Sequence, residues 1–190
     1  KNIIHKPVSL NRYISSIRGY HQYLFQTDMT IENHAQLLMP ARINKNIPVT
    51  LLVEDIDNII QSVDMNKKYA VRDKAILSLL YACGLRVSEL VELKLMSLLL
   101  DEGYVRIFGK GDKERIVPLG RKAKLDIQYY LSKLRPLLAK ESKSGGFVFL
   151  NRNGGHLTRM SIWNIFQKNC IRAGIGKKVS PHVFRHSFAT

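Results

Sequence analysis

Apolar residues recur at spacings of three and four along much of the chain, which is the pattern of amphipathic helices. The pattern predicts five helices, over residues 9–25, 51–63, 70–84, 121–139 and 161–175. The helices over 51–63 and 70–84 are expected to be core helices, and the helix over 9–25 is expected to be amphipathic with basic flanks.

Local signals predict where three of these helices begin or end. Thr50 is expected to N-cap the second helix through its hydroxyl oxygen. Gly84 and Gly174 are expected to close the third and fifth helices, since glycine accepts the left-handed backbone that often follows a helix.

Two short runs rich in β-branched residues have a different pattern. They cover 104–108 and 114–118, with Gly-Lys-Gly-Asp between them, and they predict an antiparallel hairpin. A further short strand, Phe-Val-Phe-Leu, is expected inside a glycine-rich loop at 144–156. The predicted fold class is therefore mainly α with a small antiparallel β-sheet (α+β).

Residues 40–50 interrupt the periodicity with two prolines and several polar residues. Such a stretch predicts a linker between two domains.

The last eleven residues, SPHVFRHSFAT, concentrate polar chemistry in what reads as the opening of a helix. Ser180 suits the N-cap and Pro181 the first helical position. His182 and Arg185 then share one helix face, with His186 one turn after His182. A helix N-terminus with an arginine on the same face favours an anion such as phosphate.

The net charge of the chain indicates which class of molecule it binds. The 190 residues include 30 Lys and Arg against 15 Asp and Glu, giving a formal charge of +15 and a pI near 10. The basic excess falls mainly after residue 100. These values favour nucleic acid. An anionic membrane fits less well, because the sequence has neither an 18-residue apolar run nor a lipidation signature.

Cysteine and histidine positions indicate no metal centre. Cys83 and Cys170 form no CxxC pair and are expected to be reduced, buried side chains. The remaining histidines lack metal-ligand spacing, and we expect no metal and no cofactor.

Arg86 and Lys110 are further candidates for chemistry. Arg86 follows the predicted end of a helix, and Glu89 could hold its guanidinium, although an ordinary surface ion pair fits equally well. Lys110 lies between two glycines in the hairpin turn, where it could donate to a phosphate or simply be solvated. These cations without paired carboxylates suit metal-free phosphoryl transfer.

Three motifs in order resemble the tyrosine recombinase family, and within it the Xer type. They are DKAILSLLYACGLRVSELVELKL, VRIFGKGDKERIVPLG and SPHVFRHSFAT. The resemblance implies that residues 1–43 are the C-terminal part of a helical core-binding DNA-binding domain. It also implies that residues 44–190 are the catalytic domain, truncated at its C-terminal side.

The resemblance assigns a role to each matching residue. Arg86 and Arg185 would grip the scissile phosphate, and Lys110 would protonate the leaving 5′ oxygen. His182 would move protons, and Glu89 would orient Arg86. Among basic residues outside this set, the predicted DNA contacts are Arg12, Arg18, Lys113 and Arg115.

Members of this family cut and rejoin DNA through a 3′-phosphotyrosyl link. The expected position of the nucleophilic tyrosine falls after Thr190, so the sequence shown would be inactive alone. All tyrosines of the chain precede the last motif: Tyr13, Tyr20, Tyr23, Tyr69, Tyr81, Tyr104, Tyr129 and Tyr130.

The resemblance also implies partners. These are a double-stranded DNA recombination site, a second copy or a paralogous recombinase in a synaptic tetramer, and a DNA translocase of the FtsK type. It implies Xer-type resolution of chromosome or plasmid dimers in the bacterial cytoplasm, at the nucleoid. Two alternatives stay open, a phage or transposon integrase and a non-catalytic DNA-binding relative. The apolar run in KLMSLLLDEGYV departs from the polar turn that Xer proteins usually have there.

Overall fold

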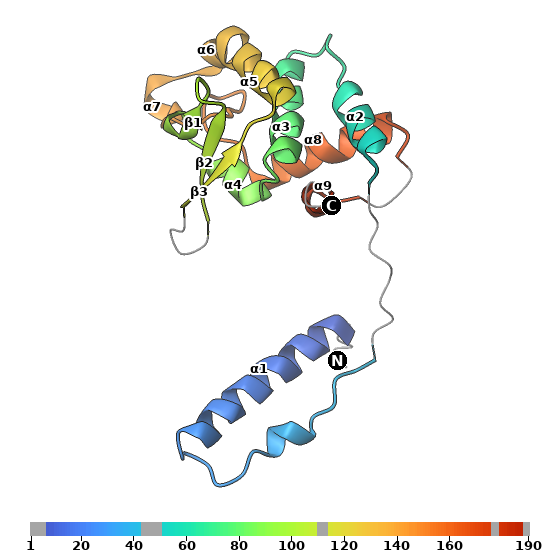
Figure 1. Cartoon of the computed structure of the whole chain (residues 1–190), viewed down its shortest axis with the longest axis vertical. Helices are drawn as coiled ribbons and strands as arrows, with labels where there is room; N and C mark the ends of the chain where they lie inside the picture. Colours follow the sequence, from blue (N-terminus) through green and yellow to red (C-terminus); the bar gives the residue numbers. More distant parts are fainter. Residues whose placement is uncertain (1–6, 43–50, 110–113, 176–178, 188–190) are drawn as a thin grey trace. The chain divides into compact units, whose positions relative to one another are not determined.

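The computed structural model describes residues 7–42, 51–109, 114–175 and 179–187 (Figure 1). The chain divides into two compact units, Lys1–Pro48 and Val49–Thr190. The elements are α1 (Pro7–Gln26), η1 (His34–Leu37), α2 (Val53–Gln61), α3 (Ala70–Ala82), α4 (Val87–Glu92), η2 (Leu95–Ser97), β1 (Leu98–Leu99), β2 (Tyr104–Phe108), β3 (Glu114–Pro118), α5 (Arg121–Lys133), α6 (Arg135–Leu138), α7 (Glu141–Ser144), α8 (Arg159–Arg172) and α9 (Pro181–His186).

The first unit consists of α1 and the segment that folds back along it through η1. The Asn11 amide holds this segment twice: its Nδ2 donates to the Ala41 carbonyl at 2.9 Å, and its Oδ1 accepts from the Ala41 N–H at 2.7 Å. Arg18 donates to the Gln36 carbonyl at 2.9 Å. Polar contacts therefore hold this pair, since α1 has no buried residue.

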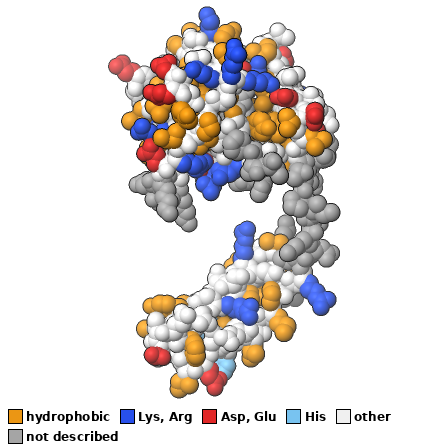
Figure 2. Space-filling view, in the orientation of Figure 1, with side chains coloured by type: hydrophobic (Ala, Val, Ile, Leu, Met, Phe, Trp, Pro, Cys, Tyr) orange, Lys and Arg blue, Asp and Glu red, His pale blue; other side chains and the backbone are white. Residues whose placement is uncertain are grey.

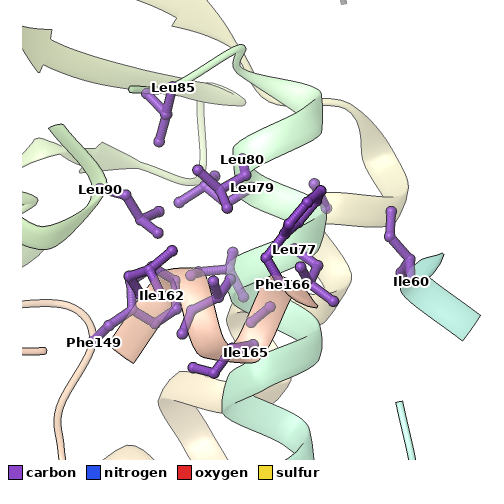
Figure 3. Packing of buried hydrophobic residues seen from close by; sticks show 14 of the residues in the cluster. Ile60, Leu77, Leu79, Leu80, Leu85, Leu90, Phe149, Ile162, Ile165 and Phe166 are labelled. Carbon is purple, nitrogen blue, oxygen red and sulfur yellow. The ribbon is translucent and has the colours of Figure 1, made fainter. Parts of the chain in front are cut away.

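The second unit is built around α3, with α2, α5, α8 and α9 packed against it (Figure 1). Side chains on several sides of α3 are buried, including Ile76, Leu77, Leu79 and Leu80. Figure 3 shows α3 side chains meeting Phe166 and other residues of α8 in this core. A helix buried on several sides is the centre of its unit, so α3 provides the support on which the surrounding elements are placed.

A three-stranded antiparallel sheet lies beside this helical core in the order β1-β2-β3. Val105 and Ile107 of β2 are buried, whereas Tyr104 and Phe108 are exposed. The register pairs Ile107 with Arg115, so these two residues share one face of the hairpin.

Buried hydrogen bonds attach the segment after α7 to the helices. Arg72 of α3, which is 7% exposed, donates to the Leu150 carbonyl at 3.0 Å. The Tyr130 hydroxyl of α5 donates to the Val148 carbonyl and accepts from the Leu150 N–H, both at 3.1 Å. These bonds satisfy backbone groups that no regular strand pairs here.

The predicted mainly α fold with a small antiparallel sheet is confirmed. The hairpin strands have the predicted bounds, and the Gly-Lys-Gly-Asp turn lies outside the described residues. Gly84 and Gly174 follow α3 and α8 with positive φ, as predicted.

Three details differ from the predictions. The N-cap position of the second helix is Leu52, whose N–H donates to Asp55 at 3.1 Å, and Thr50 lies outside the described residues. Phe-Val-Phe-Leu is not a strand, and its ends form only isolated bridges to Lys94 and His156. The long helix predicted after the hairpin divides into α5 and α6 at Leu134, just before a proline that cannot donate within a helix.

The sequence pattern also gave no sign of β1, whose two residues pair with β2. Among the helices described, none is long and apolar enough to cross a bilayer.

Candidate active site

The turn between α3 and α4 determines where Arg86 stands. Gly84 has a φ of 52°, its N–H donates to the Tyr81 carbonyl at 3.1 Å, and the Leu85 N–H donates to the Leu80 carbonyl at 3.2 Å. These two bonds form a Schellman motif, which closes α3. Leu85 then enters the core, and Arg86 becomes the N-cap residue of α4.

Glu89 lies in the first turn of α4, and its carboxylate accepts hydrogen bonds from Arg86. Its Oε2 accepts from the Arg86 backbone N–H at 2.8 Å, and its Oε1 accepts from Arg86 Nη1 at 2.9 Å. The Glu89 side chain is only 5% exposed, whereas half of the Arg86 side chain reaches solvent. Glu89 therefore holds the Arg86 guanidinium through Nη1, while half of the Arg86 side chain stays open to solvent.

Arg115 of β3 contacts the same carboxylate from the hairpin. Its Nη1 donates to Oε1 of Glu89 at 3.0 Å, and its Nη2 donates to Oε2 at 2.7 Å. Such a two-pronged contact fixes the plane of the carboxylate as well as its position.

Arg185 reaches Glu89 from α9. Phe184 beside it is fully buried, and its ring packs against Phe166 and Tyr81 with centroids 5.2 and 5.7 Å away. This anchor brings Arg185 Nη1 to 3.5 Å from Oε2 of Glu89. Among the described residues this buried Nη1 has no hydrogen-bond acceptor.

One carboxylate thus faces three guanidinium groups. Burial would raise the pKa of Glu89, but hydrogen bonds from Arg115 and Arg86 outweigh it and lower the pKa to about 2. Burial and the nearby positive charges of Arg86 and Arg115 lower the pKa of Arg185. The positive charge exceeds the negative, as a site for an anion requires.

Beside this cluster, a cavity of about 560 Å³ opens between α4 and β2. Arg86 and Glu89 line it together with Ser88, Glu92 and Phe108. Figure 2 shows a group of Lys and Arg side chains at the lower edge of the second unit.

The structure brings together three of the predicted residues, Arg86, Glu89 and Arg185. Lys110 lies outside the described residues. His182 belongs to α9, but its side chain also lies outside the description. The roles assigned to these five residues remain predictions.

Of the predicted DNA contacts, Arg115 joins the cluster, and this position was not predicted from the sequence. Strand alternation is the signal that could have placed it, because Arg115 and Val117 lie opposite the buried Ile107 and Val105. Lys113 lies outside the described residues, whereas Arg12 is exposed on α1.

Within the described residues, no group of three or more His, Cys, Asp or Glu side chains is arranged to hold a metal ion. Cys83 and Cys170 are both free and buried, and burial raises the pKa of the Cys83 thiol to about 12. Neither cysteine therefore offers a thiolate near neutral pH.

Comparison with known proteins gives matches over nearly the whole chain. The sequence profile of the phage integrase family matches residues 50–190. The chain is 42% identical over 182 residues to tyrosine recombinase XerD of Oceanobacillus iheyensis, covering 96% of this chain and 61% of that protein. It is 40% identical over 185 residues to XerD of Chlorobaculum tepidum, with coverages of 96% and 60%. The chain thus spans about three fifths of the length of these relatives.

Solved structures share the fold. The crystal structure of XerA recombinase matches with a TM-score of 0.67 at 25% identity, covering 97% of this chain and 68% of that one. XerH bound to palindromic difH in a post-cleavage complex matches with a TM-score of 0.75 at 24% identity, with coverages of 97% and 54%. A lambda integrase dimer bound to a core site matches with a TM-score of 0.70 at 17% identity, with coverages of 97% and 66%.

Proposed function

The chain belongs to the phage integrase family, and we propose that it forms part of a Xer-type tyrosine recombinase that cuts and rejoins DNA at a specific site. One observation carries the proposal: Arg86, Arg115 and Arg185 surround the carboxylate of Glu89, whose side chain is 5% exposed. Fixed donors of this kind stabilise negative charge that develops on a phosphate during transfer.

In the proposed reaction, Arg86 and Arg185 hold the non-bridging oxygens of the scissile phosphate. A tyrosine hydroxyl attacks the phosphorus, forming the 3′-phosphotyrosyl bond as the bond to the 5′ oxygen breaks. Lys110 protonates that leaving oxygen, and His182 moves the proton of the attacking hydroxyl. We assign the nucleophile to no tyrosine of this sequence. The covalent link keeps the energy of the broken bond for rejoining.

Residues 1–43 are proposed to be part of a core-binding domain and 44–190 to be the catalytic domain. The proposed partner is a duplex recombination site bound by a tetramer that contains copies of this chain or a paralogue. Support comes from relatives: XerH was solved on its difH substrate and lambda integrase as a tetramer on a Holliday junction. The same proposal places the protein in the cytoplasm at the nucleoid and includes a DNA translocase of the FtsK type as a further partner.

A Xer-type role is favoured over a phage or transposon integrase. The chain is 40–42% identical to XerD proteins, whereas the likeness to lambda integrase, at 17% identity, extends to the fold alone.

Binding of duplex DNA tests the proposed arginine contacts. We expect Arg86→Ala and Arg185→Ala each to weaken binding about tenfold, since each removes a phosphate contact. Each should also reduce the slope of log affinity against log salt by about 0.9. Fluorescence anisotropy over a range of salt concentrations measures both values.

Arg172→Ala is a matched control for Arg185→Ala. The side chain of Arg172 is 32% exposed, and its Nη2 lies 3.5 Å from Asp64, close to the values for Arg185 and Glu89. It should change affinity less than twofold. Equal losses in all three variants would contradict the assignment. If the natural protein containing this sequence forms no denaturant-resistant adduct with a nicked recombination site, strand cutting is excluded.

A further inference from the structure

Arg115 is an arginine on the inward face of a β-hairpin. The register places Arg115 opposite Ile107 and Val117 opposite Val105, and both β2 residues are buried. Glu114 and Ile116, its neighbours along β3, are exposed. Arg115 therefore lies on the face of the hairpin that carries the buried β2 residues, where 34% of its side chain is exposed.

The contact that Arg115 makes is a strong one. Its two terminal nitrogens donate to the two oxygens of Glu89 at 3.0 and 2.7 Å, and the carboxylate is almost fully buried. Charge-assisted, two-pronged bonds in such surroundings are among the strongest hydrogen bonds in proteins. The same oxygens accept both bonds from Arg86, so fixing the carboxylate also fixes Arg86.

Arg115 also shares the negative charge of the Glu89 carboxylate with Arg86 and Arg185. Without it, Glu89 would face only Arg86 and Arg185 and would draw both toward itself. With it, three guanidinium groups share one negative charge, so the cluster as a whole keeps a net positive charge for a ligand.

We propose that Arg115 is a positioning residue, which holds Glu89 so that Arg86 and Arg185 are aligned and charged to receive a DNA phosphate. This inference rests on the proposed function. It differs from the sequence-based expectation, in which Arg115 itself contacts DNA.

A double-mutant cycle in duplex binding separates the two roles. If Arg115 acts through Glu89, Arg115→Ala should weaken binding about fivefold in the original chain and less than twofold in the E89Q background. Arg115→Lys keeps the positive charge but loses the two-pronged hydrogen bonding of the guanidinium. It should weaken duplex binding two- to threefold. The salt slope should change by less than about 0.5, because no phosphate contact is removed.

Three results in these assays would overturn the inference. They are an equal loss from Arg115→Ala in both backgrounds, a fall of about 0.9 in the salt slope, and unchanged binding by Arg115→Lys. The fall in the salt slope would mean that Arg115 meets a phosphate directly. The other two results would mean that Arg115 does not act through its two-pronged contact with Glu89.

NMR titration of the Glu89 carboxyl group tests the contact independently of DNA. Arg115→Ala should raise the pKa of Glu89 from about 2 toward its ordinary value of 4.5. Arg106→Ala is the control, because Arg106 lies on β2 opposite Ile116 and pairs with Glu114, so it should leave the Glu89 pKa unchanged. An unchanged Glu89 pKa in Arg115→Ala would overturn the inference. If the unmodified chain binds no duplex, the proposed function fails while this titration still decides whether Arg115 holds Glu89.

Discussion

At the scale of single residues, Glu89 is the most consequential carboxylate of the described site. Burying a carboxylate costs free energy unless charged donors satisfy its oxygens. Here Arg86 and Arg115 donate to both oxygens, and Arg185 lies at 3.5 Å. The net result is a Glu89 pKa of about 2, below the ordinary value of 4.5, so the ionised form is favoured in the folded state.

Because the folded-state pKa of Glu89 is lowered, its contribution to stability is present above pH 4.5 and is lost as pH falls toward 2. We expect Glu89→Gln to reduce the free energy of unfolding by about 2 kcal/mol at pH 7, and by much less near pH 2.5. Urea unfolding at several pH values measures this difference. Glu114→Gln, which alters an exposed ion pair, should cost under about 0.5 kcal/mol. A Glu89→Gln cost that does not vary with pH would contradict the explanation.

At the scale of elements, the junction of α3 and α4 joins the core to the site. Gly84 adopts a left-handed backbone, after which Leu85 is buried and Arg86 begins α4. A second Schellman motif closes α8 at Gly174, where φ is 69° and the Ile175 N–H donates to the Cys170 carbonyl. Of these two turns, the one at Gly84 leads directly to a residue of the arginine cluster, Arg86, whereas the one at Gly174 does not.

Alanine at either glycine should reduce the free energy of unfolding by about 1 kcal/mol, because a Cβ disfavours positive φ. We expect Gly84→Ala also to weaken duplex binding several-fold, since it moves Arg86. Gly174→Ala should leave binding within twofold; a Cβ there would meet no atom within 4 Å among the described residues. Thermal unfolding and anisotropy measure the two effects. Equal binding by both variants would show that the turn does not position Arg86.

At the scale of the whole molecule, the two compact units differ in what stabilises them. In the described part of Lys1–Pro48, Ala35 is the one buried hydrophobic residue, whereas the core of Val49–Thr190 draws on α2, α3, α5, α8 and α9. Stability in small units depends on buried apolar area.

We therefore expect the fragment 49–190 to unfold cooperatively on heating, with near-UV circular dichroism typical of packed aromatic rings. The fragment 1–48 should show no cooperative transition, because Ala35 is the one hydrophobic residue buried in its described part. A mixture of both fragments serves as the control for association. A cooperative transition in fragment 1–48 alone would mean that buried area does not govern its stability.

The sequence by itself determined the features that depend on local spacing. Helical periodicity, glycine caps and β-branched runs predict the helices and the hairpin, since these follow from interactions between residues a few positions apart. The pairing of Arg86 with Glu89 is also local, at three residues on one helix.

Tertiary structure decided the rest. Arg115 and Arg185 reach Glu89 from distant parts of the chain, and only the packing of β3 and of the Phe184 anchor brings them there. In Phe-Val-Phe-Leu, which is not a strand, Tyr130 and Arg72 hydrogen-bond to backbone groups of Val148 and Leu150. Local patterns carry no information about such distant partners, because packing between elements selects them.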